Sequence, residues 1–195
     1  TSGGTISLDG GATVTSRGLV YGTSSLSSTF SVTSGTGTGT YSIGLTGLTP
    51  ATTYYVRSFA TNSVGTVYGT ETNFTTIAVE PTVSATAVPA SITGSSATSG
   101  GTISSNGGST VTVSGIVWST TSTPTIALST KTTNGAATGT YTSSITGLAP
   151  ATLYYVRAYA TNSIGTAYGP QNNFTTLAIA PTISATATVI SITGT

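Results

Sequence analysis

GLTPATTYYVRSFATNSVGTVYG, from Gly47 to Gly69, returns as GLAPATLYYVRAYATNSIGTAYG, from Gly147 to Gly169. Self-similarity over so long a period indicates that one small domain has been copied in tandem. Tandem copies of this kind build arrays, spacers and adhesive surfaces more often than catalytic sites. The duplication therefore favours a structural or adhesive chain over an enzyme.

The duplication extends beyond this block in both directions. Pro81 recurs as Pro181, whereas Tyr21 corresponds to Trp118, so the second copy carries extra residues between these two landmarks. We place them between Thr120 and Asn134, because insertions accumulate in loops and edge strands. The repeat predicts three regions: a domain that lacks its first strand over residues 1–79, a complete domain over residues 80–179, and the first strand of a third repeat over residues 180–195.

The composition excludes several classes of partner and chemistry. Only 4% of the 195 residues are charged and the net charge is +1, so the chain has no field of either sign to attract nucleic acid. Cysteine, histidine and methionine are absent. Their absence removes disulfides, thiol nucleophiles, imidazole bases and the commonest transition-metal ligands. We expect no cofactor, no metal site and no nucleic-acid partner.

The chain contains no apolar run that approaches the roughly 18 residues needed to span a bilayer, so we expect no membrane insertion. A surface of Ser and Thr with little charge is typical of a secreted protein, and we expect an extracellular location at the cell surface. The chain has no methionine at its start and opens within a repeat. We therefore expect it to be a segment of a longer protein.

Alternation of apolar and hydroxyl residues predicts an all-β protein. Runs such as TVTVSGIVW and TLYYVRAYA have the period of half-buried strands, and threonine favours strands because it is β-branched. Turn signals divide each copy into seven short strands, the number expected for a β-sandwich. In the second copy these include a first strand within Pro81–Thr93, a third over Val111–Trp118 and a short edge strand over Thr125–Lys131. Asp9-Gly10-Gly11 and Asn106-Gly107-Gly108 supply the positive φ of a tight hairpin.

One motif carries a family resemblance. Its first copy is Leu48, Pro50, Thr52, Tyr54, Val56 and Ala60, and its second is Leu148, Pro150, Thr152, Tyr154, Val156 and Ala160. Both resemble the signature around the sixth strand of fibronectin type III domains, which implies tandem seven-stranded fibronectin type III/Ig-like β-sandwiches. The resemblance assigns Tyr54 and Tyr154 to the tyrosine corner, whose hydroxyl bonds to nearby backbone. The family's usual tryptophan on the second strand is missing, and Trp118 lies on the third strand instead.

The Thr-, Ser- and Gly-rich variant of the motif is most similar to tandem modules in long surface proteins of gliding, type IX-secreting bacteria. Those proteins include adhesins, and similar modules accompany secreted glycosidases. The resemblance implies adhesion or spacing as the role of such modules.

The phase of the sixth strand predicts a candidate interaction face. If Tyr54 and Val56 face the core, alternation turns their neighbours outward. On the third strand we expect Arg17 to avoid burial, which also assigns Leu19 and Tyr21 to the outer face. The predicted face comprises Leu19, Tyr21, Tyr55, Arg57 and Phe59 in the first copy and Ile116, Trp118, Tyr155, Arg157 and Tyr159 in the second. It is either aromatic support for an arginine stem, worth about 0.5 to 1 kcal/mol, or a repeated surface that binds glycans or proteins.

The acidic residues give no basis for catalysis. Asp9, Glu71 and Glu80 are replaced in the second copy by Asn106, Gln171 and Ala180. No carboxylate pair recurs, and no histidine is present to activate the many hydroxyls. We predict that the chain is not an enzyme and has no catalytic residues.

The sequence thus predicts a non-enzymatic structural or adhesive segment of a secreted bacterial surface protein, such as an adhesin stalk or an extracellular filament. The alternative is a spacer or carbohydrate-binding accessory module of an extracellular polysaccharide-degrading enzyme. Expected partners are glycans, cell-surface proteins or neighbouring repeat proteins, with head-to-tail or lateral self-association. Residues Pro181–Thr195 form a first strand without a domain of their own. Either the natural chain continues, or this segment completes the first domain of the next molecule.

Overall fold

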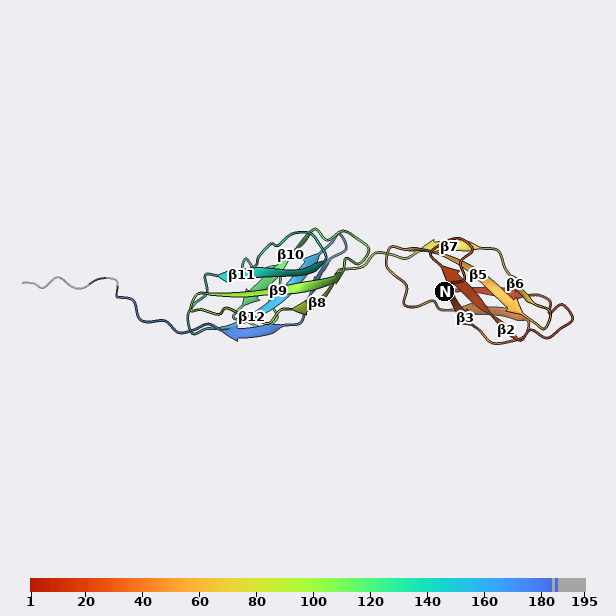
Figure 1. Ribbon diagram of the computed structural model, residues 1–195, viewed down its shortest axis with the longest axis horizontal. Helices are drawn as coiled ribbons and strands as arrows, with labels where there is room; N and C mark the ends of the chain where they lie inside the picture. The colour runs from red at the N-terminus through yellow and green to blue at the C-terminus, as the bar shows by residue number, and fades with distance from the viewer. Residues whose placement is uncertain (184, 186–195) are drawn as a thin grey trace, which may run out of the picture. The chain divides into compact units, whose positions relative to one another are not determined.

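The computed structural model describes residues 1–183 and 185, which form two compact units. The first unit comprises Thr1–Thr82 with the loops Ser105–Thr112 and Thr161–Thr166, and the second comprises Val83–Ser104, Val113–Ala160 and the residues from Ala167 onward. Strands β1–β7 belong to the first unit, and strands β8–β14 belong to the second apart from end residues (Figure 1). No helix among the described residues is long and apolar enough to cross a membrane.

The first unit is built from two antiparallel sheets. One sheet pairs β1 (Ser2–Ile6) with β4 (Gly39–Ile43). The other has the order β3 (Phe30–Thr33), β2 (Ser16–Gly22), β5 (Thr53–Thr61) and β6 (Thr66–Tyr68), and β7 (Thr72–Thr75) also pairs with β5. The last strand of the sheet is thus divided into two short pieces, which pair with successive parts of β5.

The second unit repeats this arrangement with two differences: β8 (Thr82–Thr86) is added to its smaller sheet, and two isolated bridges, Ser114–Gly135 and Val117–Lys131, stand where the first unit has β3. Its smaller sheet has the order β11 (Gly139–Thr146), β9 (Ser96–Ser105) and β8. Its larger sheet has the order β10 (Val113–Ser119), β12 (Leu153–Thr161) and β13 (Thr166–Tyr168), with β14 (Asn172–Thr175) also paired with β12. The described chain is all-β, and the predicted fibronectin type III/Ig-like β-sandwich is confirmed as the fold class.

Two predicted strands are shorter in the structure than in the sequence analysis. The segment Pro81–Thr93 forms β8 only to Thr86, followed by a single bridge between Ala90 and Thr98. Pro89 has no N–H to donate, so the ladder cannot continue through it. The segment Thr125–Lys131 forms a turn and an isolated bridge between Lys131 and Val117. Most of the predicted strand over residues 180–195 lies outside the described residues.

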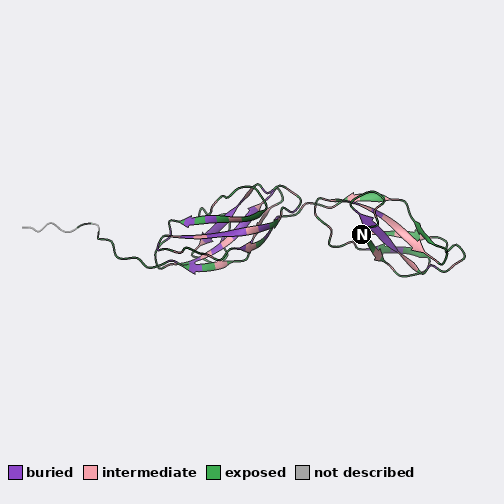
Figure 2. Cartoon of the chain, viewed as in Figure 1, coloured by how far each residue is buried: buried purple, intermediate pink, exposed green. Residues whose placement is uncertain are grey.

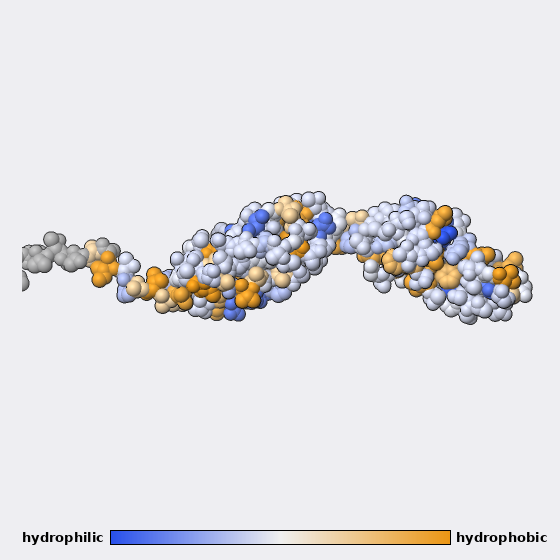
Figure 3. Space-filling model, in the orientation of Figure 1, coloured by the Kyte–Doolittle hydropathy of each residue, from blue (hydrophilic) through white to orange (hydrophobic). Residues whose placement is uncertain are grey.

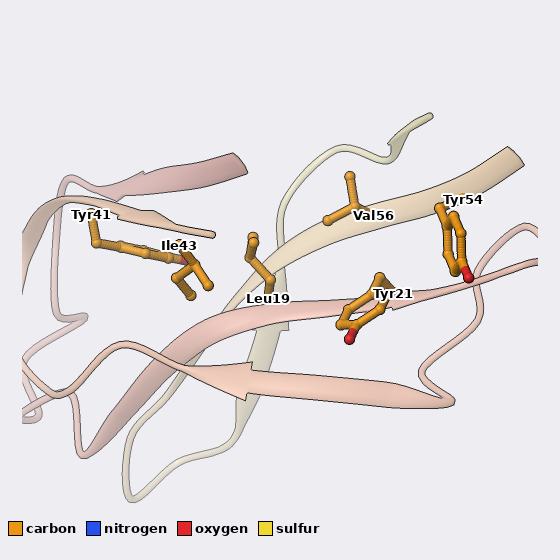
Figure 4. Packing of buried hydrophobic residues seen from close by; sticks show 6 residues of the cluster. All are labelled: Leu19, Tyr21, Tyr41, Ile43, Tyr54 and Val56. Atoms are coloured by element: carbon orange, nitrogen blue, oxygen red, sulfur yellow. The ribbon is translucent and has the colours of Figure 1, made fainter. Parts of the chain in front are cut away.

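Each unit has its own apolar core. In the first unit the buried cluster combines β2, β4 and β5, and Figure 4 shows its six members: Leu19, Tyr21, Tyr41, Ile43, Tyr54 and Val56. In the second unit the fully buried side chains include Ile103, Ile116, Val117, Ile145 and Val156. Figure 2 shows more buried residues along the strands of the second unit than along those of the first. The second core is therefore more completely covered.

The two glycine-rich turns adopt the backbone that was predicted but serve a different connection. Gly10 and Gly107 both have φ of 70°, and the side chain of the preceding Asp9 or Asn106 accepts a hydrogen bond from the backbone two residues on. These turns link β1 to β2 and β9 to β10, which belong to different sheets. The prediction of a tight hairpin is wrong, because the chain crosses between the sheets at this point.

Candidate interaction face

The predicted outer face is wrong for its third-strand members, which lie in the core. Leu19 and Ile116 are 0% exposed, and Tyr21 and Trp118 are each 9% exposed. The pairing of Tyr21 with Val56 puts both side chains on one face of the sheet, and both belong to the buried cluster. These four residues therefore stabilise the sandwich and cannot form a binding surface.

The prediction failed because it assumed that Arg17 would avoid the core side of the sheet. In the structure Arg17 lies on the same face of β2 as Leu19 and Tyr21. Its guanidinium lies at the end of β2, where the loop before β4 supplies carbonyl acceptors. Nη1 donates to Thr38 O at 2.8 Å and to Gly37 O at 3.2 Å, and Nε donates to Ser34 O at 3.3 Å. The guanidinium also lies 5.2 Å from the centre of the Tyr41 ring. An arginine with these partners can border a core, because its donors are satisfied there.

The true outer face is formed mainly by alternate residues of β5 and β12. Val20 pairs with Arg57, and Gly18 pairs with Phe59. A Cβ atom at Gly18 would lie 2.9 Å from Phe59 Cε1, so this aromatic ring covers the glycine of the neighbouring strand. The second unit repeats the contact, because a Cβ atom at Gly115 would lie 3.0 Å from Tyr159 Cε1. Aromatic cover of a strand glycine is a known way to stabilise a sheet.

Tyr159 is also buried, so it too leaves the predicted interaction face. It is 2% exposed, and its hydroxyl donates to Thr132 O at 2.7 Å. Burial raises the pKa of this hydroxyl above its ordinary value. Phe59, its counterpart, is half-buried. Of the residues predicted for this face, those that retain access to solvent are Tyr55, Arg57, Phe59, Tyr155 and Arg157.

An arginine stacked on a tyrosine occupies the same position in both units. The Cζ atom of Arg57 lies 4.6 Å from the centre of the Tyr68 ring, and the Cζ atom of Arg157 lies 4.6 Å from the centre of the Tyr168 ring. Tyr68 and Tyr168 belong to β6 and β13, beside β5 and β12. Sequence reasoning missed them, although both stand in the repeated block just before Gly69 and Gly169. We define the outer stack as Tyr55, Arg57 and Tyr68 in the first unit and Tyr155, Arg157 and Tyr168 in the second.

The loop after β2 in the first unit and the loop after β10 in the second are each held by a side chain that lies just before β7 or β14. In the first unit Glu71 accepts hydrogen bonds from Ser25 Oγ at 2.7 Å and from Leu26 N at 2.5 Å. These bonds, with the charge of Arg57, hold the pKa of the Glu71 carboxyl below its ordinary value. In the second unit Gln171 Oε1 accepts from Thr123 N at 2.5 Å. The same loop is therefore held by a charged acceptor in one unit and a neutral acceptor in the other.

Two pairs of tyrosines have structural roles in the interior. The hydroxyl of Tyr54 accepts from Thr49 N, and that of Tyr154 accepts from Ala149 N, each at 3.0 Å. These are the bonds that a tyrosine corner requires. The Tyr41 and Tyr141 hydroxyls donate to Gly18 O and Gly115 O, each at 2.6 Å. Burial raises the pKa of Tyr141 from 10.0 to about 12.

Two of the three acidic side chains, Asp9 and Glu71, bind local backbone groups. No group of three His, Cys, Asp or Glu side chains lies close enough to hold a metal ion in residues 1–183 and 185. Asp9 is used in its own turn and Glu71 in its loop. Pale, weakly polar residues dominate the visible face in Figure 3, with apolar residues scattered among them.

No protein-family model matches the sequence, and comparison with curated proteins finds no match. Comparison with solved structures finds partial similarity to the following three, each with a TM-score below 0.5. The sensor domain of the anti-sigma factor RsgI4 in Pseudobacteroides cellulosolvens has 17% identity and a TM-score of 0.39, over 52% of this chain and 98% of that one. The FN1-FN3 domains of chicken CNTN1 have 19% identity and a TM-score of 0.36, over 83% of this chain and 56% of that one. Domains A168-A170 of titin have 18% identity and a TM-score of 0.39, over 86% and 56%.

This chain thus spans little more than half of the CNTN1 and titin chains that it matches. The β-sandwich itself is defined by the strand pairings of this chain.

Proposed function

We propose that this chain is a non-enzymatic structural and adhesive segment of a secreted bacterial surface protein, serving as part of a stalk or filament. The observation that carries the proposal is the repetition of the outer stack, with Arg and Tyr 4.6 Å apart in both units. A contact surface that recurs with each sandwich would let an array bind at many points at once, which raises its avidity without a strong single site.

The outer stack has the composition of a contact surface. Tyrosine rings offer a large area at low entropic cost, and they suit both glycans and protein surfaces. Arg57 is fixed in place, because Nη2 donates to Leu26 O at 3.0 Å. Tyr68 is 48% exposed beside it. The stack therefore presents an ordered ring rather than a mobile side chain.

The mechanical part of the proposal rests on the separate cores. Leu19, Tyr54 and Val56 are buried in the first unit, and Ile116, Ile145 and Val156 are buried in the second. A unit with its own core can resist unfolding without its neighbour. Each sandwich would then act as one link of a stalk, and the hydroxyl-rich surface would keep the links soluble with little charge.

Attachment of the full chain to a glycan array and to bacterial cells tests the adhesive role. Replacing Tyr68, Tyr155 and Tyr168 by Ser removes three of the four rings of the outer stack, and we expect attachment to fall at least tenfold with circular dichroism unchanged. Three Thr→Ser changes on the other sheet, at Thr5, Thr102 and Thr140, provide the control. Unchanged attachment by the tyrosine variant would contradict the adhesive role, and selective binding to one soluble polysaccharide would favour the accessory-module alternative.

A further inference from the structure

The charged side chains are divided unevenly between the two units. All three acidic residues of the chain lie in the segment Thr1–Thr82, which belongs to the first unit. The segments of the second unit contain two basic residues, Lys131 and Arg157, and no Asp or Glu. The second unit therefore carries two positive side chains that no acidic side chain of its own balances.

Tyr168 connects these two basic side chains. The Cζ atom of Arg157 lies 4.6 Å from the centre of the Tyr168 ring. The hydroxyl of the same ring accepts a hydrogen bond from Ile126 N at 3.0 Å, and Ile126 O accepts one from Lys131 Nζ at 2.8 Å. The two cations and the ring between them thus form one connected group. We define the cationic cluster as Lys131, Arg157 and Tyr168.

Both cations of the cluster keep donors for a ligand. Arg157 Nε donates to Gly169 O at 3.2 Å, but its two Nη atoms have no hydrogen-bond partner in the described part of the chain. Lys131 Nζ donates to two backbone carbonyls, those of Ile126 and Leu128, which leaves one of its three hydrogens. Lys131 is exposed and Arg157 is half-buried. All of these acceptors are neutral, so both charges remain available to an anion.

The first unit compensates its corresponding arginine. Hydrogen bonds from the neighbouring loop come first among the causes that lower the pKa of the Glu71 carboxyl, and the charge of Arg57 adds to them. The carboxylate and the guanidinium are therefore close enough to act on each other. At the equivalent position the second unit has the neutral Gln171, and it also holds the only lysine of the chain. Attraction for an anion is thus expected at the second unit and not at the first.

We propose that the cationic cluster binds an acidic polysaccharide, one whose sugars carry carboxylate or sulfate groups. This inference rests on the proposed adhesive function and names the class of ligand for the outer stack of the second unit. The free Nη atoms of Arg157 match the two oxygens of an anionic group, and Lys131 adds a second positive charge. The rings of Tyr155 and Tyr168 offer apolar area to the sugar rings beside those groups.

The position of the cluster favours a glycan over an acidic peptide. Extended peptides commonly bind by adding a strand to the edge of a sheet, through main-chain hydrogen bonds. Tyr155 and Arg157 belong to β12, which pairs with β10 and also with β13 and β14, so its backbone is already used. A ligand on this face meets side chains rather than free backbone. Rings, hydroxyls and two cations are suited to a chain of sugars that carries anionic groups at a regular interval.

Binding of the full 195-residue chain to immobilised polysaccharides, followed by biolayer interferometry, tests the proposal. Two acidic polymers are compared with neutral partners of the same backbone: polygalacturonate with its methyl ester, and dextran sulfate with dextran. We expect tighter binding to at least one acidic polymer than to its neutral partner. The preference should disappear as NaCl rises from about 0.1 M to about 1 M, because the screening length falls from about 10 Å to about 3 Å. No preference for either acidic polymer, or a preference that salt leaves unchanged, would overturn the proposal.

A charge variant tests whether the cluster is the site. Gln171→Glu keeps an acceptor for Thr123 N and places a carboxylate near Arg157, as in the first unit. Affinity for the acidic polymer should fall about fivefold, the upper end of what an exposed ion pair contributes. Thr140→Glu is the matched control, because it adds the same charge at an exposed position of the other sheet, and it should bind like the unchanged chain. Equal losses in the two variants would show that the cluster is not the site.

Two further measurements separate this inference from its alternatives. Immobilised polyglutamate supplies the same carboxylates on a peptide, and binding to it as tight as to polygalacturonate would overturn the assignment to a glycan. The triple replacement of Tyr68, Tyr155 and Tyr168 by Ser tests adhesion itself. If that variant loses attachment to cells while the unchanged chain shows no preference for acidic polymers, the adhesive function stands and this inference fails.

Discussion

The two units share a motif, yet the strand orders of their sheets differ at two edges: among the described residues, β8 has no counterpart in the first unit, and β3 has only isolated bridges as its counterpart in the second. In the second unit β8 lies over Gly169, and Arg157 Nε donates to Gly169 O at 3.2 Å. In the first unit β1 pairs with β4 alone among the described strands, Gly69 is exposed, and the buried Arg57 Nε has no hydrogen-bond partner in the described part of the chain. The difference teaches that β8 covers, through Val83 and Thr86, the glycine whose counterpart is exposed in the first unit.

The two units also differ in the side chain that accepts a hydrogen bond from the loop after β2 in the first unit and after β10 in the second. Leu26 and Thr123 both have positive φ, at 56° and 57°. This conformation is unfavourable for a residue with a side chain, and in each unit one side chain binds the backbone N–H at that position. Exchange of Glu71 for Gln171 keeps the contact and removes its charge. A carboxylate and an amide oxygen can therefore hold the equivalent loop through the same backbone N–H.

The largest expected effect comes from the core position that the sequence placed on the surface. Ile116→Ala should destabilise the second unit by about 2 to 5 kcal/mol, because a fully buried isoleucine leaves a cavity. Denaturant unfolding followed by the fluorescence of Trp118 measures it. Leu153→Ala, at a position 44% exposed, is the control and should cost far less. Equal losses would restore Ile116 to the outer face.

An intermediate effect is expected from the contact that anchors β8. Thr86→Val preserves the shape of the side chain but leaves the N–H of Ala158 without its acceptor, and this should cost the second unit about 1 to 3 kcal/mol. Thr102→Val is the matched control, because it removes a hydroxyl that pairs with Thr140 at an exposed site. Denaturant unfolding distinguishes the two. If both variants lose the same stability, β8 contributes no more than a surface pair.

The smallest effect concerns pH and should appear in one unit alone. The pKa of Glu71 is lowered by Ser25, Leu26 and Arg57, so its support of the loop is complete above the ordinary value of 4.5 and is lost as the pH falls through the lowered pKa. The amide resonance of Leu26 should shift in acid, whereas that of Thr123 should not. The exchange of roles provides the control: Glu71→Gln should abolish the shift, and Gln171→Glu should create one at Thr123. Identical acid titrations of the two loops would contradict this account.

The sequence predicted the parts of the fold in which alternation has a clear meaning. On β5 and β12, Tyr54, Val56 and their counterparts face the core, and the corner hydroxyls bond as the resemblance implied. On these two strands the repeated motif indicated which side chains face the core.

The inward and outward sides of β2 and β10 could not be predicted in the same way, because both faces of these strands are buried. Val20 and Val117 are buried together with Leu19 and Ile116, so hydrophobicity carries no phase along these strands. The outer side of β2 was therefore assigned from the expectation that Arg17 avoids burial. Its hydrogen-bond partners are loop carbonyls, which no local sequence pattern reveals. The pairing of Arg57 with Tyr68 likewise depends on the register between β5 and β6, which only the folded sheet provides.

Hydrogen–deuterium exchange of the two equivalent strands tests the central difference between the units most directly. The experiment uses the full 195-residue chain at low concentration. Peptides that cover β1 should exchange much faster than peptides that cover β9, because β9 is paired on both sides and β1 on one side only. Equal protection of β1 and β9 would contradict the account, since a strand with one described neighbour would then be as well protected as a strand with two.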